Sequence, residues 1–248
     1  MTIRLRPLAL AATAVVLATP VRAQTGFVVE YPPVQSTAAA RSREWMMETR
    51  RLDWLASGLN TWIRMPRRVA LRMVECPSSD IRWNAAEHAV EMCYRMITRI
   101  YGLAAGQDSL RAAAPGAHLF VNFHGVVHAI IGELDVPVGA DAEAAVDELT
   151  ALLLVAAGPR ELPLFVLDGI SSLHRADPEW STWEYATEHG LGPERFRNVA
   201  CLVYGADAEG FTSLRTAGLV PAGAQQRCRA AALRSVNLWS RRLGRYLR

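Results

Sequence analysis

Two histidines spaced four residues apart carry the most specific chemistry in this sequence. His124 and His128 lie in the apolar stretch 120–134 (FVNFHGVVHAIIGEL), which predicts one helix. Residues four apart differ by about 40° around a helix, so both imidazoles should point the same way, as two metal ligands from one helix would. Hydrogen-bonded core histidines are also common on apolar helices, and the pair alone favours that structural role.

A pair of acids on the next predicted helix favours a metal site over a purely structural role for the two histidines. Glu143 follows His128 by 15 residues, across a Pro/Gly break, and Asp147 follows Glu143 by four. Glu-x-x-x-Asp packed against His-x-x-x-His predicts a His/His/Glu metal site with an open position for water. Asp147 would accept a hydrogen bond from the far nitrogen of a ligand histidine. The alternative is a solvated acidic face, because Asp141 and Glu148 lie on the same stretch.

The residue after the first histidine is a glycine. In zinc peptidases with an H-E-x-x-H motif this position holds the glutamate that takes a proton from zinc-bound water. Gly125 has no side chain for that task. Nearby acids are poor substitutes, because Glu133 should lie on the opposite face of the helix and Glu148 should point elsewhere. Glu188 or His189 could reach the site only through long-range folding.

The pattern along the chain predicts a mostly helical α+β fold. We expect a small sheet packed on the histidine helix and a helical C-terminal half. Residues 24–39 should be an extended lead-in and residues 106–116 a loop or short helix. Strands are expected at 68–75 and 89–93, and helices at 40–65, 94–103, 120–134, 141–157, 162–174, 193–204, 211–217 and 225–246.

Composition indicates an exported, folded chain. Met1–Ala23 has a basic start, an apolar stretch and a small-residue cleavage site, which is typical of a signal peptide. No linker divides residues 24–248, so we expect a single domain, and no later apolar run is long enough to span a bilayer. The predicted localisation is periplasmic or secreted.

The charge balance gives no reason to expect a nucleic-acid partner. All 27 basic residues are arginines, and three of them lie in the predicted signal peptide. The remaining 24 arginines match the 24 acids, so the mature chain has no net charge. A peptide or protein partner is expected instead.

The cysteine count favours two disulfides. An even number of cysteines in an exported chain is typical of a disulfide framework. Sequence order predicts that Cys76 pairs with Cys93 and Cys201 with Cys228.

With these features together, the chain resembles a family of exported bacterial proteins classed as zincin-like metallopeptidases. The central pattern of that family reads F-H-E-x-G-H-A, then L-D-x-P, then E-D-x-A-D. The matching residues here are Phe123, His124, His128, Ala129, Leu134, Asp135, Pro137, Glu143 and Asp147. Further matches run from Arg68 to Leu243 and include Cys76, Asn84, Cys93, Tyr94, Trp183, His189, Arg195, Phe196, Asn198, Cys201, Tyr204, Gly205, Cys228 and Trp239.

The resemblance implies a zinc site on His124, His128 and Glu143, with Asp147 behind it. The chain departs from the pattern at three positions: Gly125 replaces the glutamate, Val127 replaces a glycine, and Arg95 replaces the glutamate of a Cys-Tyr-Glu segment. The resemblance therefore does not carry over peptidase activity.

Three functional hypotheses follow. The first is a degenerate metallopeptidase homologue that keeps a zinc site and lacks its general base. The second is an active zinc-dependent hydrolase with a non-standard base. The third is a scaffold without a metal, in which some of the seven tryptophans form a peptide-binding groove.

Overall fold

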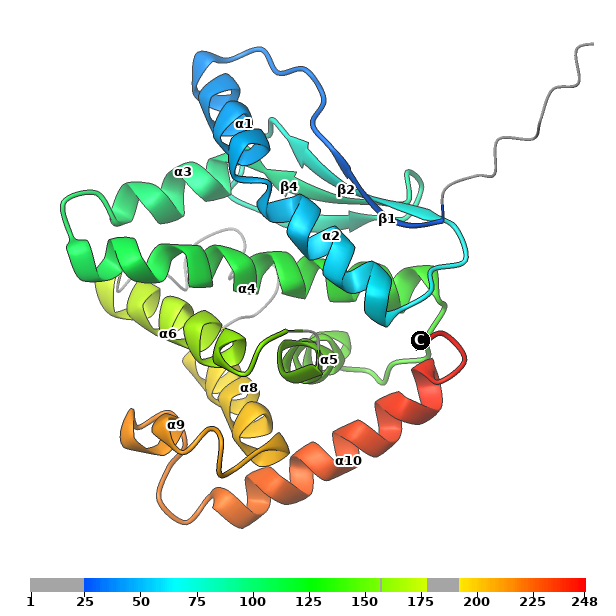
Figure 1. The fold of residues 1–248 in the computed structure, drawn as a ribbon, viewed down its shortest axis with the longest axis vertical. Helices are drawn as coiled ribbons and strands as arrows, with labels where there is room; N and C mark the ends of the chain where they lie inside the picture. The colour runs from blue at the N-terminus through cyan, green and yellow to red at the C-terminus, as the bar shows by residue number, and fades with distance from the viewer. Residues whose placement is uncertain (1–24, 157, 178–191) are drawn as a thin grey trace, which may run out of the picture.

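The computed structural model describes residues 25–156, 158–177 and 192–248, and shows an α+β fold in which helices predominate (Figure 1). A small sheet and two helices lie at one end, a long central helix crosses the middle, and further helices build the other end. The predicted fold class is confirmed. The predicted signal peptide and the segment around Trp183, Glu188 and His189 lie outside the described residues.

The sheet has four strands in the order β1-β2-β4-β3. The first three of these run parallel, and β3 is antiparallel to β4. Alternation in β2 turns Val69, Leu71 and Met73 into the core. On the other face Arg72 pairs with Glu30 of β1 at 2.6 Å. The strands are β1 Gly26–Glu30, β2 Arg68–Val74, β3 Ile81–Asn84 and β4 Ala89–Cys93.

The N-terminal part departs from the predicted elements in three places. The expected extended lead-in contains β1 and the start of a helix, and β3 was not predicted. The single helix expected over 40–65 is two helices, α1 (Thr37–Thr49) and α2 (Arg51–Trp62). Arg50 between them adopts the left-handed conformation with φ 51°, which ends one helix and redirects the next while the apolar periodicity continues.

The histidine helix is much longer than predicted. After α3 (Tyr94–Leu103), α4 runs through Asp108–Glu133 and includes most of the residues expected to form a loop or a short helix. Pro115 lies inside α4, where its missing N–H removes only one helical hydrogen bond. Apolar neighbours bury this part of the helix, so tertiary packing outweighs the local cost of proline.

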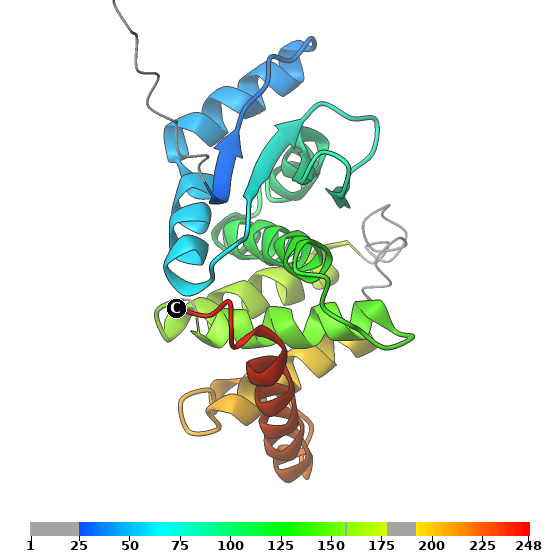
Figure 2. The ribbon, with the colours of Figure 1, turned by 90° about the vertical axis from the view of Figure 1, so that its right-hand side faces the viewer.

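The C-terminal half consists of helices packed below α4, as predicted. Figure 2 shows them stacked away from the sheet, with α10 at the far end. None of the helices within the described ranges has the length and apolarity needed to cross a membrane. The helices are α5 Ala142–Ala156, α6 Glu161–Ala176, α8 Pro193–Ala206, α9 Ser213–Thr216 and α10 Gln225–Leu243.

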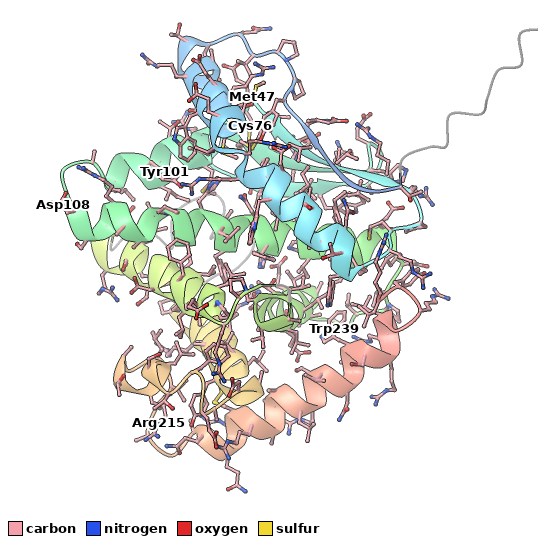
Figure 3. The ribbon with its side chains drawn as sticks, viewed as in Figure 1. Met47, Cys76, Tyr101, Asp108, Arg215 and Trp239 are labelled. Atoms are coloured by element: carbon pink, nitrogen blue, oxygen red, sulfur yellow. A yellow bond between two sulfur atoms is a disulfide. The ribbon has the colours of Figure 1, made fainter. Side chains whose placement is uncertain are left out.

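Two disulfides join elements of this fold, and both predicted pairings are confirmed. Cys76, after β2, is bonded to Cys93 at the end of β4. Cys201 of α8 is bonded to Cys228 of α10. Figure 3 labels Cys76 near the sheet and Trp239 on α10, and Trp239 Nε1 donates a hydrogen bond to Glu148 of α5 at 3.2 Å.

Candidate metal centre

The candidate centre lies where the C-terminal half of α4 meets the first turn of α5. Asp135 adopts a left-handed conformation, φ 48°, directly after α4, and the chain turns back at this point. The Asp141 carboxylate accepts a hydrogen bond from the Ala144 N–H at 3.0 Å, which favours starting α5 there. This start places Glu143 in the first turn of α5, opposite His124 and His128.

The possible metal-binding atoms of the three side chains lie at nearly equal distances from one another. The two Nε2 atoms of His124 and His128 are 3.2 Å apart. Glu143 presents Oε2 to His124 Nε2 at 3.2 Å and Oε1 to His128 Nε2 at 3.2 Å. Ligands bound about 2.0–2.1 Å from a tetrahedral zinc ion stand about 3.3 Å from one another. The donor atoms therefore have the spacing that one small cation requires.

The donor chemistry and the burial also fit a metal ion. Two imidazole nitrogens and a carboxylate oxygen are a common ligand set for zinc with an open position. The His124 side chain is fully buried, whereas His128 and Glu143 are 21% and 27% exposed. The group is thus anchored in the core on one side and accessible on the other. Within the described residues, His124, His128 and Glu143 form the group whose donor atoms lie close enough together to hold a metal ion.

Asp147 lies behind the group, but its contacts differ from the expectation. Its Oδ1 is 3.6 Å from His124 Nδ1, which is longer than a hydrogen bond. Its Oδ2 instead accepts a hydrogen bond from Arg195 Nε at 2.7 Å. Burial raises the pKa of Asp147 to about 6, although the Arg195 guanidinium beside it acts in the opposite direction.

Arg195 is the site residue that reasoning from the sequence did not assign. It comes from α8, 48 positions after Asp147, and its Nη2 lies 3.4 Å from Glu143 Oε2. The ion pairs raise the pKa of Arg195 even though burial favours its neutral form. The family resemblance included Arg195 without a role, and only the packing of α8 against α5 brings it to the carboxylates.

The space beside Gly125 is filled by the sheet. A Cβ atom on Gly125 would lie 2.4 Å from Ile81 Cδ1 and 2.6 Å from Ile81 Cγ1. It would also lie 3.3 Å from a methyl of Val90 on β4. A larger side chain at this position therefore requires Ile81 to move, because distances below about 3.0 Å are steric clashes.

Glu133 and Glu148, considered as substitutes for the base, are each held by another partner. Glu133 is paired with Arg67 at 2.6 Å and with His88 at 2.7 Å. Glu148 is held by Trp239. Glu188 and His189 lie outside the described residues.

Comparison with known proteins gives one match. A family model described as "Putative metallopeptidase" matches residues 31–243. A search of curated proteins and a search of solved structures found no match. Because the matched region contains the His/His/Glu group and covers most of the chain, this protein belongs to the family described as "Putative metallopeptidase".

Proposed function

We propose that this protein is an exported, degenerate member of its family, which binds zinc through His124, His128 and Glu143 and has lost peptidase activity. The observation that carries the proposal is the combination of a compact ligand triangle with a filled space at Gly125. The two disulfides support export, because disulfides persist in oxidising compartments. We also propose that residues 24–248 form one domain.

Each ligand residue has a distinct part in holding the ion. His124 is fixed by complete burial, and His128 repeats its direction one turn later. Glu143 supplies the negative ligand from the start of α5. With Asp147 behind and Arg195 beside it, the cluster keeps one net negative charge when the histidines are neutral, which favours a cation.

The chemistry that a zinc ion supplies in such a site is a lowered pKa for a bound water. Using that water on a peptide bond also requires a group that accepts its proton and passes it to the leaving amine. Gly125 supplies no such group, and Ile81 occupies the adjoining space. General acid–base catalysis contributes typically about 10²–10⁴-fold, so we expect negligible peptidase activity.

Metal analysis of the purified protein tests this proposal. We expect about one zinc per chain by mass spectrometry after equilibration with limiting zinc, and loss of that zinc in His124→Ala and His128→Ala. His88→Ala is the matched control, because His88 pairs with Glu133 and should leave the zinc content unchanged. Chelation should also lower the melting temperature of the wild-type protein.

Two results would contradict the proposal. Failure to bind stoichiometric zinc, or unchanged zinc in His124→Ala, would remove the metal site. Chelator-sensitive hydrolysis of peptides would keep the metal site and overturn the loss of activity.

A further inference from the structure

A second pocket lies between α2, α4 and α6, away from the metal centre. Its volume is about 390 Å³, which is within the usual range for small-molecule sites. Arg51 and Trp54 line it from α2, His118 and Asn122 from α4, and Phe165 from α6. In Figure 1, α4 runs between α2 and α6. The pocket thus combines polar and aromatic side chains from three separate helices.

Two polar side chains of α4 form the most buried part of the pocket lining. His118 and Asn122 are four residues apart, so they project from the same face of the helix. Asn122 and His124 differ by about 200° around α4, so this face is opposite to that of the metal ligands.

Neither of these buried side chains has a hydrogen-bond partner. His118 is 3% exposed and Asn122 is 4% exposed, and neither side chain makes a hydrogen bond within the described residues. Buried polar groups are nearly always hydrogen-bonded, because an unpaired group lowers stability. A ligand in the pocket would supply the partner that each of them lacks.

The charge of the pocket favours an anion. Arg51 donates a hydrogen bond from Nη1 to Tyr101 Oη at 3.1 Å, and its guanidinium lies 5.0 Å from the ring centroid of Trp45. Within the described residues, no Asp or Glu lines the pocket or forms an ion pair with Arg51. Burial, followed by the nearby Arg51 guanidinium, lowers the pKa of His118 to about 3. The imidazole is therefore neutral and keeps one N–H donor.

The outer part of the pocket is aromatic. Trp54 is 50% exposed and Phe165 is 42% exposed. Five large apolar side chains are exposed among the described residues, and these two line the same pocket. Aromatic side chains pack favourably against other rings, so this pair favours a ligand with an aromatic ring.

We propose that this pocket binds a small aromatic carboxylate. The carboxylate accepts hydrogen bonds from Arg51, His118 and Asn122, and the bond from the guanidinium is strengthened by charge. The aromatic ring of the ligand packs against Trp54 and Phe165. A free aromatic acid and an aromatic residue at the C-terminus of a peptide present the same groups. The inference does not rest on the metal centre.

NMR titration of the full chain with phenylacetate tests the ligand chemistry. We expect a dissociation constant on the order of 1 mM or lower, as is usual for a ligand of this size. Phenylacetamide, which has no charge, should bind at least about 10-fold more weakly, and acetate, which has no ring, should not bind detectably. The tripeptide Ala-Ala-Phe is the second arm. Tighter binding of the tripeptide assigns the pocket to peptide C-termini, and tighter binding of phenylacetate assigns it to free acids.

Variants of exposed residues test the location of binding without disturbing the core. Arg51→Gln and Trp54→Ser should each weaken phenylacetate binding by about 10-fold. Arg234→Gln and Leu233→Ser are the matched controls, because they remove an exposed arginine and an exposed apolar side chain from α10. Both controls should bind phenylacetate as the wild type does.

The variant Asn122→Leu separates ligand binding from a structural role. It replaces an unpaired buried amide by an apolar group of similar size, so it should raise the melting temperature while weakening phenylacetate binding. A structural role for the amide predicts a lower melting temperature with unchanged affinity, and that result would overturn the proposal. Absence of binding by both phenylacetate and the tripeptide would also overturn it, as would equal affinities for phenylacetate and phenylacetamide.

Discussion

At the scale of single residues, the candidate centre combines three possible metal ligands with a closely packed glycine. His124, fully buried on α4, is the anchor of the ligand group. The adjacent Gly125 is packed against Ile81 of β3, which has 1% of its surface exposed. A glutamate at position 125 would therefore have to displace Ile81 in the contact between helix and sheet.

This packing makes a testable prediction for Gly125→Glu. We expect this variant to be destabilised by roughly 1–3 kcal/mol through overpacking against Ile81 and to gain no peptidase activity. Adding Ile81→Ala should recover part of that loss, so that the two changes show a coupling of at least about 1 kcal/mol in urea unfolding. Peptidase assays of the double variant then test whether the site can hydrolyse peptides once it contains a carboxylate at position 125.

A second glycine provides the control for this experiment. Gly58 lies in α2, and a Cβ there would meet no atom within 4 Å. Gly58→Glu should therefore be neutral or slightly stabilising, since glycine is a poor helix former. Equal stability of Gly125→Glu and Gly58→Glu would show that Ile81 does not restrict the site.

At the scale of elements, the position of α4 depends on close packing against α6. A Cβ on Gly169 of α6 would lie 2.2 Å from Ala117 N and 2.5 Å from Gly116 C, both backbone atoms of α4. A Cβ on Gly116 would lie 2.3 Å from Phe165 O. These glycines allow the two backbones to approach, and α4 carries both histidines. The alignment of the two histidines thus depends on a crossing about two to three turns away along α4.

We expect Gly169→Ala to lower the free energy of unfolding by about 3 kcal/mol. Backbone atoms cannot rotate away as a side chain can, so the cost should lie at the upper end for overpacking. Gly102→Ala in α3 is the matched control, because a Cβ there meets nothing within 4 Å. The free energy of unfolding of this control should rise by roughly 0.5–1 kcal/mol. Equal stabilities of the two variants in urea unfolding would refute the close crossing.

At the scale of the whole molecule, a continuous hydrophobic core extends from the sheet to α10. The disulfide between Cys201 and Cys228 ties α8, which supplies Arg195, to α10, the C-terminal helix. The backbone packs closely at the same place, since a Cβ on Gly205 would lie 2.1 Å from Cys228 O. Both a disulfide and close backbone packing therefore hold α10 against the helix that supplies Arg195.

Removing this disulfide should destabilise the protein and loosen α10 first. For a sequence separation of 27, the chain-entropy model gives a loss of about 3–4 kcal/mol in Cys201→Ser/Cys228→Ser. Amide hydrogen exchange should then accelerate in α10 more than in α4. Cys76→Ser/Cys93→Ser, with a separation of 17, should cost about 3 kcal/mol without this preference for α10. Unchanged exchange in α10 would contradict the tether.

The sequence by itself determined the features that depend on local spacing. The i, i+4 histidines, the i, i+4 acids of the following helix, the helical C-terminal half and both cysteine pairings follow from periodicity and order along the chain. The same reasoning failed where packing overrides local preference. It did not predict that α4 continues through Pro115, that the chain turns at Arg50, or that β3 forms.

Only the tertiary structure decided which distant groups complete the site. It brought Arg195 to Asp147 and Ile81 to Gly125, because α8 packs against α5 and β3 packs against α4. Neither contact has a periodic signal, since the partners are separated by 48 and 44 positions. The spacing of the arginines of α10 was visible in the sequence, but their exposure required the fold. Spacing along one helix fixes direction, whereas contact between elements depends on the packing of the whole chain.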